Sequence, residues 1–286
     1  MTATRPRFGS LITTLFLLGF SQASVAGNKY DDALPVWEIG VGIGALSFPH
    51  YPGADQSQTL VLPFPLVVYR GDTLRADRGG LKGILYDGGD TVIDVSIRGS
   101  LPVDSSDNRA RSGMEDLDPT LEIGPQISWT LFKDDRNQLR FRLPFRTVIS
   151  VGSGLAHEGN VFNPNLRWDH QVNSNFGFTT RASLRFGDGK WHDYFYSVNA
   201  ADALPSRPEY DAPGGYSGSS LSLSGTYKTG DWRLGMALGL EWLNGAAFED
   251  SPLVKQDSAW FVGLALSKTL FKSKRTTSTR VESDRR

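Results

Sequence analysis

Charged side chains placed at every second position of long apolar runs are the groups in this sequence most able to do chemistry. Between residues 138 and 151, Arg140, Arg142 and Arg146 alternate with apolar residues such as Phe141. The same spacing in other stretches gives a set of ionisable positions that we predict to share one face: Glu38, Asp94, Arg98, Glu122, Arg140, Arg142, Arg146, Arg167, Asp169, Arg181, Arg185, Arg233 and Glu241. Such a face predicts either cross-strand ion pairs or a positive ring that selects anions.

A short polar turn at residues 133–137 joins two of these stretches. We therefore expect Glu122 to pair across strands with Arg140 or Arg142. Buried charges need partners because the loss of their hydration is costly.

Histidine and cysteine usage indicates no catalytic centre. The chain has four histidines and no cysteine, so disulfides, thiol catalysis and cysteine metal sites are excluded. We expect His50, His157 and His192 on long loops and His170 near a short turn, and no spacing pairs one of them with a serine or a metal. The sequence thus predicts a protein that is not an enzyme, with no cofactor and no metal.

The elements that carry these charges have a period of two. A transmembrane barrel strand needs about 9–11 tilted residues, apolar outside and polar inside. The run at 232–242 fits this pattern, and so does the run at 60–68, where we expect the leucines outside and Pro63 and Pro65 opposite. Beyond residue 26, no apolar stretch is long enough to form a membrane-spanning helix. We predict an all-β fold, a single antiparallel transmembrane β-barrel.

The connections alternate in length. Short turns are expected at 133–137, 173–175 and 229–231. Long loops are expected at 104–118, 152–160, 188–215 and 244–258. Bacterial barrels have short periplasmic turns, long extracellular loops and an even strand number. Twelve strands result if residues 72–86 form a hairpin, and ten if they do not. The aromatic residues of 188–215 are expected either to anchor that loop at the membrane interface or to form a recognition surface.

The two ends differ from the middle of the chain. Residues 1–26 have the basic start, short apolar stretch and small-residue site of a secretory signal, so we predict their removal. Residues 27–271 form the predicted barrel, and the basic segment 272–286 is expected to be disordered. Without Arg5 and Arg7 of the predicted signal, 28 basic and 31 acidic residues remain, and this weak net charge of −3 argues against a nucleic-acid partner.

Several segments together resemble one known family, although none would suffice alone. They are 40–49, Tyr51-Pro52-Gly53-Ala54-Asp55-Gln56-Ser57, 66–81, Ser100-Leu101-Pro102-Val103-Asp104, 114–120, Arg207-Pro208-Glu209-Tyr210-Asp211-Ala212, Gly214-Gly215-Tyr216 and Ser251-Pro252-Leu253-Val254. The chain resembles the MipA/OmpV family, the MltA-interacting proteins of the Gram-negative outer membrane. One departure is that Phe271, the candidate terminal aromatic residue of such barrels, is followed by further residues.

The resemblance implies an outer-membrane protein in contact with lipid. It also implies a non-catalytic scaffold that joins a lytic murein transglycosylase to a bifunctional penicillin-binding protein. Other members are porin-like, adhesive or antibiotic-responsive, and the family has no agreed catalytic residues. Three functions therefore stay open: the scaffold, a narrow channel or entry protein for small solutes or antibiotics with an arginine-lined lumen, and a surface adhesin that acts through 188–215.

Overall fold

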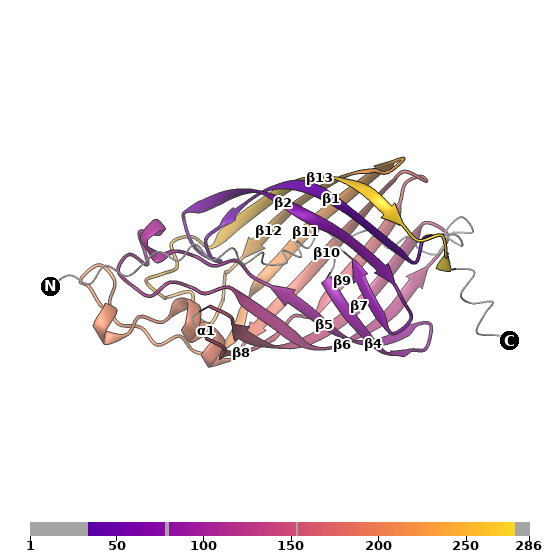
Figure 1. Ribbon diagram of the computed structural model, residues 1–286. Helices are drawn as coiled ribbons and strands as arrows, with labels where there is room; N and C mark the ends of the chain where they lie inside the picture. The colour runs from indigo at the N-terminus through magenta and orange to yellow at the C-terminus, as the bar shows by residue number, and fades with distance from the viewer. Residues whose placement is uncertain (1–33, 78–79, 153, 278–286) are drawn as a thin grey trace.

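The protein is a closed antiparallel β-barrel in the computed structural model, which describes residues 34–77, 80–152 and 154–277 (Figure 1). The ring closes because β10 pairs with β11. The strands are β1 (Trp37–Pro49), β2 (Ser57–Arg70), β3 (Leu74–Asp77), β4 (Gly80–Asp87), β5 (Thr91–Gly99), β6 (Thr120–Lys133), β7 (Asn137–Ser150), β8 (Ala156–Phe162), β9 (Asn165–Gln171), β10 (Phe176–Gly187), β11 (Gly215–Thr229), β12 (Trp232–Trp242) and β13 (Ser258–Lys272).

These thirteen strands of the described chain occupy twelve positions in the ring. β8 and β9 follow one another along a single position, since both pair with β7 on one side and with β10 on the other. The interruption falls at Asn163 and Pro164, and proline has no N–H to donate to a ladder. β3 and β4 form the predicted hairpin, so the twelve-strand alternative is confirmed and the ten-strand alternative is wrong.

One predicted loop is much shorter in the structure. We expected a loop over 152–160, but β8 begins at Ala156. The polar side chains that suggested a loop bond across the sheet instead. Ser150 donates to Glu158 at 2.7 Å, and Thr147 donates to Asn160 at 2.9 Å.

The outer surface of the barrel is apolar, as alternation predicts. On β12 the side chain of Arg233 is buried inside the barrel. The large apolar side chains that alternate with the inner positions of this strand are all exposed: Trp232, Leu234, Met236, Leu238, Leu240 and Trp242. Exposure of large apolar side chains around a closed barrel is the pattern of a lipid-facing surface. No helix among the described residues is long and apolar enough to cross a membrane.

The predicted orientation of β2 is wrong. Val61 and Val67 lie on the outside, while Leu66 and Val68 are buried inside with 2% of their surface exposed. The reason is the neighbouring strand, because the inner face of β1 carries Gly40, Gly42 and Gly44, in register with Leu66, Phe64 and Leu62. Large apolar side chains from β2 fill the space that the glycines leave, so this wall of the lumen is apolar.

The largest cluster of buried apolar residues lies in the long connections rather than in the barrel. Residues 50–56, 101–119, 188–214 and 243–257, which we call the cap, pack against one another at one end (Figure 1). Their buried apolar side chains are Tyr51, Ala54, Val103, Leu117, Tyr196, Val198, Ala212, Leu243, Ala246, Phe248 and Leu253. The rings of Tyr196 and Phe248 stack with centroids 3.6 Å apart. The cap is therefore a folded layer over the barrel mouth.

A short helix of the cap was not predicted. α1 (Gly189–Tyr196) begins after Asp188, whose Oδ1 accepts a hydrogen bond of 2.9 Å from the Trp191 N–H. Its other oxygen accepts from the Asn160 N–H at 2.9 Å, which ties the helix to β8. Trp191 and Tyr196 are buried, so for these two residues the prediction of a place at the membrane interface or on a recognition surface is wrong.

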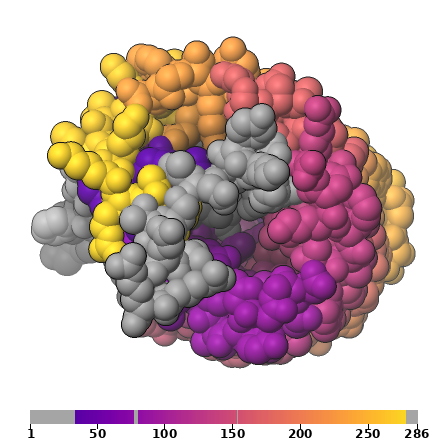
Figure 2. Space-filling model, turned by 90° about the vertical axis from the view of Figure 1, so that its right-hand side faces the viewer, coloured from indigo at the N-terminus to yellow at the C-terminus, as the bar shows by residue number. Residues whose placement is uncertain are grey.

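At the opposite end the short turns surround a hollow in the ring (Figure 2). The turns at 133–137 and 173–175, and the turn between β11 and β12, lie where the sequence predicts them. The first part of the predicted tail extends the sheet, since the Ser273 N–H donates to Trp37 and the Val36 N–H donates to Arg275. The predicted signal at 1–26 and residues 278–286 lie outside the described residues.

Candidate functional site

The ionisable residues that we predicted on one face all lie on strands, and none of them is fully exposed. Seven are buried: Glu38, Asp94, Arg142, Arg146, Arg167, Asp169 and Arg233. Six are half-buried: Arg98, Glu122, Arg140, Arg181, Arg185 and Glu241. They alternate with outward apolar residues, which places them on the wall of the lumen.

Asp169 is the centre of one cluster toward the turn end. Its side chain is 1% exposed and lies 2.6 Å from the guanidinium nitrogens of both Arg140 and Arg167. The hydroxyl of Thr179 donates to the same carboxylate at 2.6 Å. Three strands, β7, β9 and β10, are thereby linked around one carboxylate.

Glu38 is the centre of a second cluster. It accepts from Arg70 at 2.7 Å and from Arg233, and Arg233 also donates to Thr269 at 2.6 Å. Since these residues lie on β1, β2, β12 and β13, the cluster crosses the seam where the first and last strands meet.

A polar ladder runs between these clusters. Arg142 donates to Gln126 at 2.7 Å, Gln126 donates to Asp94 at 3.0 Å, and Arg146 donates to Ser96 at 2.9 Å. Gln126 and Ser96 are uncharged, so two arginines of this ladder have neutral acceptors.

The predicted pairing of Glu122 with Arg140 or Arg142 is wrong. The turn at 133–137 sets the register of β6 and β7 so that Glu122 lies opposite Val148, far along the strand from Arg140. On its other side Glu122 lies opposite Arg98 of β5. Arg140 bonds to Asp169 instead, and Arg142 bonds to Gln126.

Arginines crowd one wall of the lumen. Arg167 of β9 is the register partner of Arg140 on β7 and of Arg181 on β10. Arg142 lies two positions after Arg140 on the same face of β7. Eight arginines and five carboxylates make up the predicted set, so these residues together give the lumen a positive excess.

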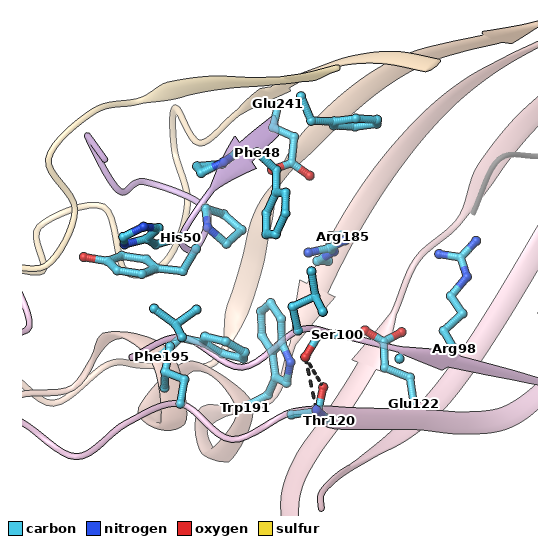
Figure 3. A pocket seen from close by; sticks show the side chains of 18 of the residues that line it. Phe48, His50, Arg98, Ser100, Thr120, Glu122, Arg185, Trp191, Phe195 and Glu241 are labelled. Carbon is cyan, nitrogen blue, oxygen red and sulfur yellow. Dashed lines mark hydrogen bonds between the residues drawn. The ribbon is translucent and has the colours of Figure 1, made fainter. Parts of the chain in front are cut away.

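A cavity of about 420 Å³ lies between the cap and the barrel interior (Figure 3). Its charged lining consists of Arg98, Glu122, Arg185 and Glu241, from β5, β6, β10 and β12, together with Asp118 of the cap. Its apolar lining includes Phe48, Trp191, Phe195 and Phe261. This size lies within the range of pockets for small ligands.

The charged strand residues that line the cavity differ in their pairing from the Glu38 and Asp169 clusters elsewhere in the lumen. Within the described chain, Arg98, Glu122, Arg185 and Glu241 make no side-chain hydrogen bond and no ion pair of 4 Å or less. Arg185 instead lies 5.8 Å from the ring centroid of Trp191. Figure 3 shows Arg98 and Glu122 on one side of the cavity and Glu241 on another, with Arg185 between them.

The aromatic walls of this cavity were missed by sequence reasoning. Trp191 and Phe195 belong to α1, and Phe48 lies at the end of β1. A signal was present, since residues 40–49 are among the segments that carry the family resemblance. His50, which we expected on a loop, also lines this cavity just after β1.

The other histidines have different surroundings. His157 is exposed on β8, and His170 of β9 bonds to Asn137 at 2.7 Å. His192 is completely buried in α1, where its Nδ1–H donates to the Pro213 carbonyl at 2.6 Å and its Nε2 accepts from the Ser217 hydroxyl at 2.7 Å.

The His192–Ser217 pair is a structural contact of the cap. Burial lowers the pKa of His192 below its ordinary value of 6.5, although the bond to Pro213 opposes this shift. The recess that Ser217 lines is about 20 Å³, too small for a substrate. Across the ranges that the structure describes, no cluster of three or more histidine, aspartate or glutamate residues is arranged to hold a metal ion.

A closed antiparallel barrel with an apolar exterior, charged interior and loops of unequal length at its two ends is an outer-membrane β-barrel protein. The family model described as MltA-interacting protein MipA matches residues 41–270, and the chain belongs to this family. The resemblance drawn from the sequence segments is thus confirmed.

Several solved outer-membrane proteins are similar to this chain. An outer membrane channel from Pseudomonas putida F1 has 10% identity over 85% of this chain and 99% of its own, with a TM-score of 0.48. OmpT of Vibrio cholerae has 8% identity over 82% of this chain and 96% of its own, with a TM-score of 0.38. The channel DcaP of Acinetobacter baumannii has 10% identity over 82% and 97%, with a TM-score of 0.34. None of the curated proteins matches this sequence.

Proposed function

We propose that this barrel admits small anionic solutes into an arginine-lined lumen and has no catalytic activity. The observation that supports this function is a row of arginines on one wall, where Arg140, Arg167 and Arg181 are register partners across β7, β9 and β10. Rings of arginine select anions in channels because their field raises the local anion concentration.

A purely structural lumen would explain this arrangement less well. In the Glu38 and Asp169 clusters every arginine has a carboxylate in direct contact, because each carboxylate bonds to two guanidinium groups. Arg142 and Arg146 instead bond to an amide and a hydroxyl, so their charges are not neutralised by direct contact. Mutual repulsion of buried like charges costs stability, and an anion in the lumen offsets that cost.

Conductance of the purified barrel in planar bilayers tests this function. We expect a small current whose reversal potential in a salt gradient indicates anion selectivity. Selectivity should fall in Arg142→Gln and Arg146→Gln. The matched control is Arg75→Gln, because the Arg75 side chain is 44% exposed and pairs with Asp87 outside this wall. A barrel that passes no current, or that prefers cations, would contradict the proposal.

A second candidate function is the scaffold for murein enzymes. The observation that favours it is the description of the family itself, MltA-interacting protein MipA. The short turns would then contact a lytic murein transglycosylase and a penicillin-binding protein on the periplasmic side, opposite the cap. Affinity capture with a purified lytic transglycosylase tests this function, with an unrelated barrel as the control. Equal recovery of the enzyme on both barrels would count against the scaffold.

A further inference from the structure

The cavity below the cap has an unusual balance of groups for a lumen with excess arginine. Arg98 and Glu122 face each other in register on β5 and β6. Arg185 and Glu241, on β10 and β12, line both this cavity and the small recess beside Ser217. The strands thus present two guanidinium groups and two carboxylates to the cavity, and the cap adds the carboxylate of Asp118, so groups of both signs surround a ligand.

From this balance we propose that the cavity binds small zwitterions of the amino-acid or short-peptide kind with an aromatic side chain. A carboxylate of the ligand would accept hydrogen bonds from Arg185 or Arg98, and its ammonium group would donate to Glu241 or Glu122. Guanidinium–carboxylate bonds are charge-assisted and stronger than neutral ones. A simple anion would bond to the arginines alone, and the carboxylates of both glutamates would repel it.

The pairing pattern supports this assignment. Within the described residues, the Glu38 and Asp169 carboxylates each bond to two arginines, whereas the four strand charges around the cavity bond to no side chain. They are also half-buried, so they have lost part of their hydration. Charged groups in a partly dehydrated pocket gain more from an ionic ligand than the same groups gain at an open surface.

The apolar lining favours an aromatic body for the ligand. Phe48, Phe195 and Phe261 contribute rings from β1, α1 and β13, and Trp191 adds an indole beside Arg185. Aromatic rings prefer edge-to-face or offset contacts with one another, which adds to the gain from burial alone. A dipeptide with two rings and free termini combines all of these groups.

The test measures the binding of phenylalanyl-phenylalanine to the full barrel in detergent. Titration calorimetry gives the affinity, and tryptophan fluorescence reports on the surroundings of the cavity. We compare it with the same dipeptide acetylated at the amino end, amidated at the carboxyl end, or both. Loss of one charge-assisted contact should weaken binding about tenfold, and loss of both should weaken it further. Equal binding of the zwitterion and the doubly blocked dipeptide would overturn the proposal.

Variants locate the site. Arg185→Gln and Glu241→Gln should each weaken the zwitterion about tenfold. The matched controls are Arg109→Gln and Glu209→Gln, because both residues are exposed on the cap and neither lines the cavity. Circular dichroism and the heat-dependent gel mobility of barrels show whether each variant is folded. Should a charge variant not fold, Trp191→Phe serves in its place, and it should abolish the ligand-induced fluorescence change while calorimetry still detects binding.

Unchanged affinity in the folded Arg185→Gln and Glu241→Gln variants, or a ligand-induced fluorescence change that persists in Trp191→Phe, would overturn the proposed site. The binding experiment does not depend on conductance. A dipeptide that fails to bind would therefore contradict the proposed ligand site and not the proposed anion pathway. A barrel that binds the dipeptide but passes no current would contradict only the pathway.

Discussion

Phe64 occupies the space that a side chain at Gly42 would need. The two residues are register partners on β1 and β2, and a Cβ atom built on Gly42 would overlap the Phe64 ring. The arrangement repeats across β12 and β13, where Phe261 lies over its register partner Gly239. A phenylalanine that covers a glycine on the neighbouring strand fixes both register and inner volume, so these glycines are required for packing.

Replacement of Gly42 by alanine should therefore destabilise the barrel by about 1–3 kcal/mol, the usual cost of overpacking. The measurement is the urea midpoint of unfolding in lipid vesicles. Gly83→Ala on β4 is the control, because no atom lies within 4 Å of a Cβ built there. The double variant Gly42→Ala with Phe64→Leu should recover part of the loss. A midpoint for Gly42→Ala equal to that of Gly83→Ala would contradict the packing argument.

Asp169→Asn should be one of the most destabilising single changes in the lumen. It leaves Arg140 and Arg167 without their carboxylate, and loss of one partner from a buried ion pair typically costs about 3–5 kcal/mol. The control is Asp87→Asn, which breaks the partly exposed pair with Arg75 and should cost at most about 1 kcal/mol. The free energies of unfolding of both variants give the comparison, and equal losses would show that the Asp169 cluster adds little.

Strand faces with strict alternation were predictable from the sequence. On β7 large apolar side chains alternate with arginines, and on β12 they alternate with small or charged residues, so period two alone fixes which face meets lipid. β2 has apolar residues on both faces, and its orientation depends on the glycines of β1, to which it pairs. A pattern within one strand cannot contain that information, which is why the prediction for β2 was inverted.

The site was predictable only in part for a similar reason. Alternation identified Arg98, Glu122, Arg185 and Glu241 as inner residues, but the register of each hairpin decides which of them meet. The cap was not predicted at all, because its core joins segments that are far apart in the sequence. Tyr196, for example, donates a hydrogen bond to Pro52 at 3.0 Å across 144 residues.

The stability of the cap should depend on pH through His192. The pKa of His192 in the folded cap lies below 6.5, whereas the same imidazole in the unfolded cap has its ordinary pKa near 6.5. Protonation therefore favours the unfolded cap, and the free energy of unfolding of the cap should fall as the pH drops below 6.5 and not change above it. Hydrogen exchange of cap amides between pH 7 and pH 5, corrected for the intrinsic rates, measures this.

The control for this pH dependence is His192→Gln, which has no titratable group but still has a donor and an acceptor. Hydrogen bonds hold the pKa of Asp188, beside α1, below its ordinary range even though burial opposes this, so Asp188 stays ionised over the same interval. The variant should show no change in corrected exchange between pH 7 and pH 5. A pH dependence that persists in the variant would assign the effect to another group.

Arg207 should hold two loops of the cap together. Its guanidinium donates to the carbonyls of Ala110 at 2.9 Å and Ser112 at 3.0 Å on one loop, and to the Asp202 carbonyl at 2.7 Å on its own loop. A guanidinium has five donors in a planar fork, whereas a lysine ammonium is a compact charge that cannot reach both loops in the same geometry.

Arg207→Lys should therefore loosen the cap while the barrel stays folded. Each lost bond from a charged donor to a buried carbonyl costs about 1.5–3 kcal/mol, and the loss falls on the loops, since none of these three acceptors lies on a strand. Limited proteolysis should cut within 101–119 and 188–214 sooner than in the parent protein, with an unchanged barrel fragment. Arg109→Lys is the control, because the Arg109 side chain is 77% exposed and, among the residues that the structure describes, bonds only to Asp55. Cleavage at the same rate in both variants would mean that the apolar core of the cap, and not Arg207, holds these loops in place.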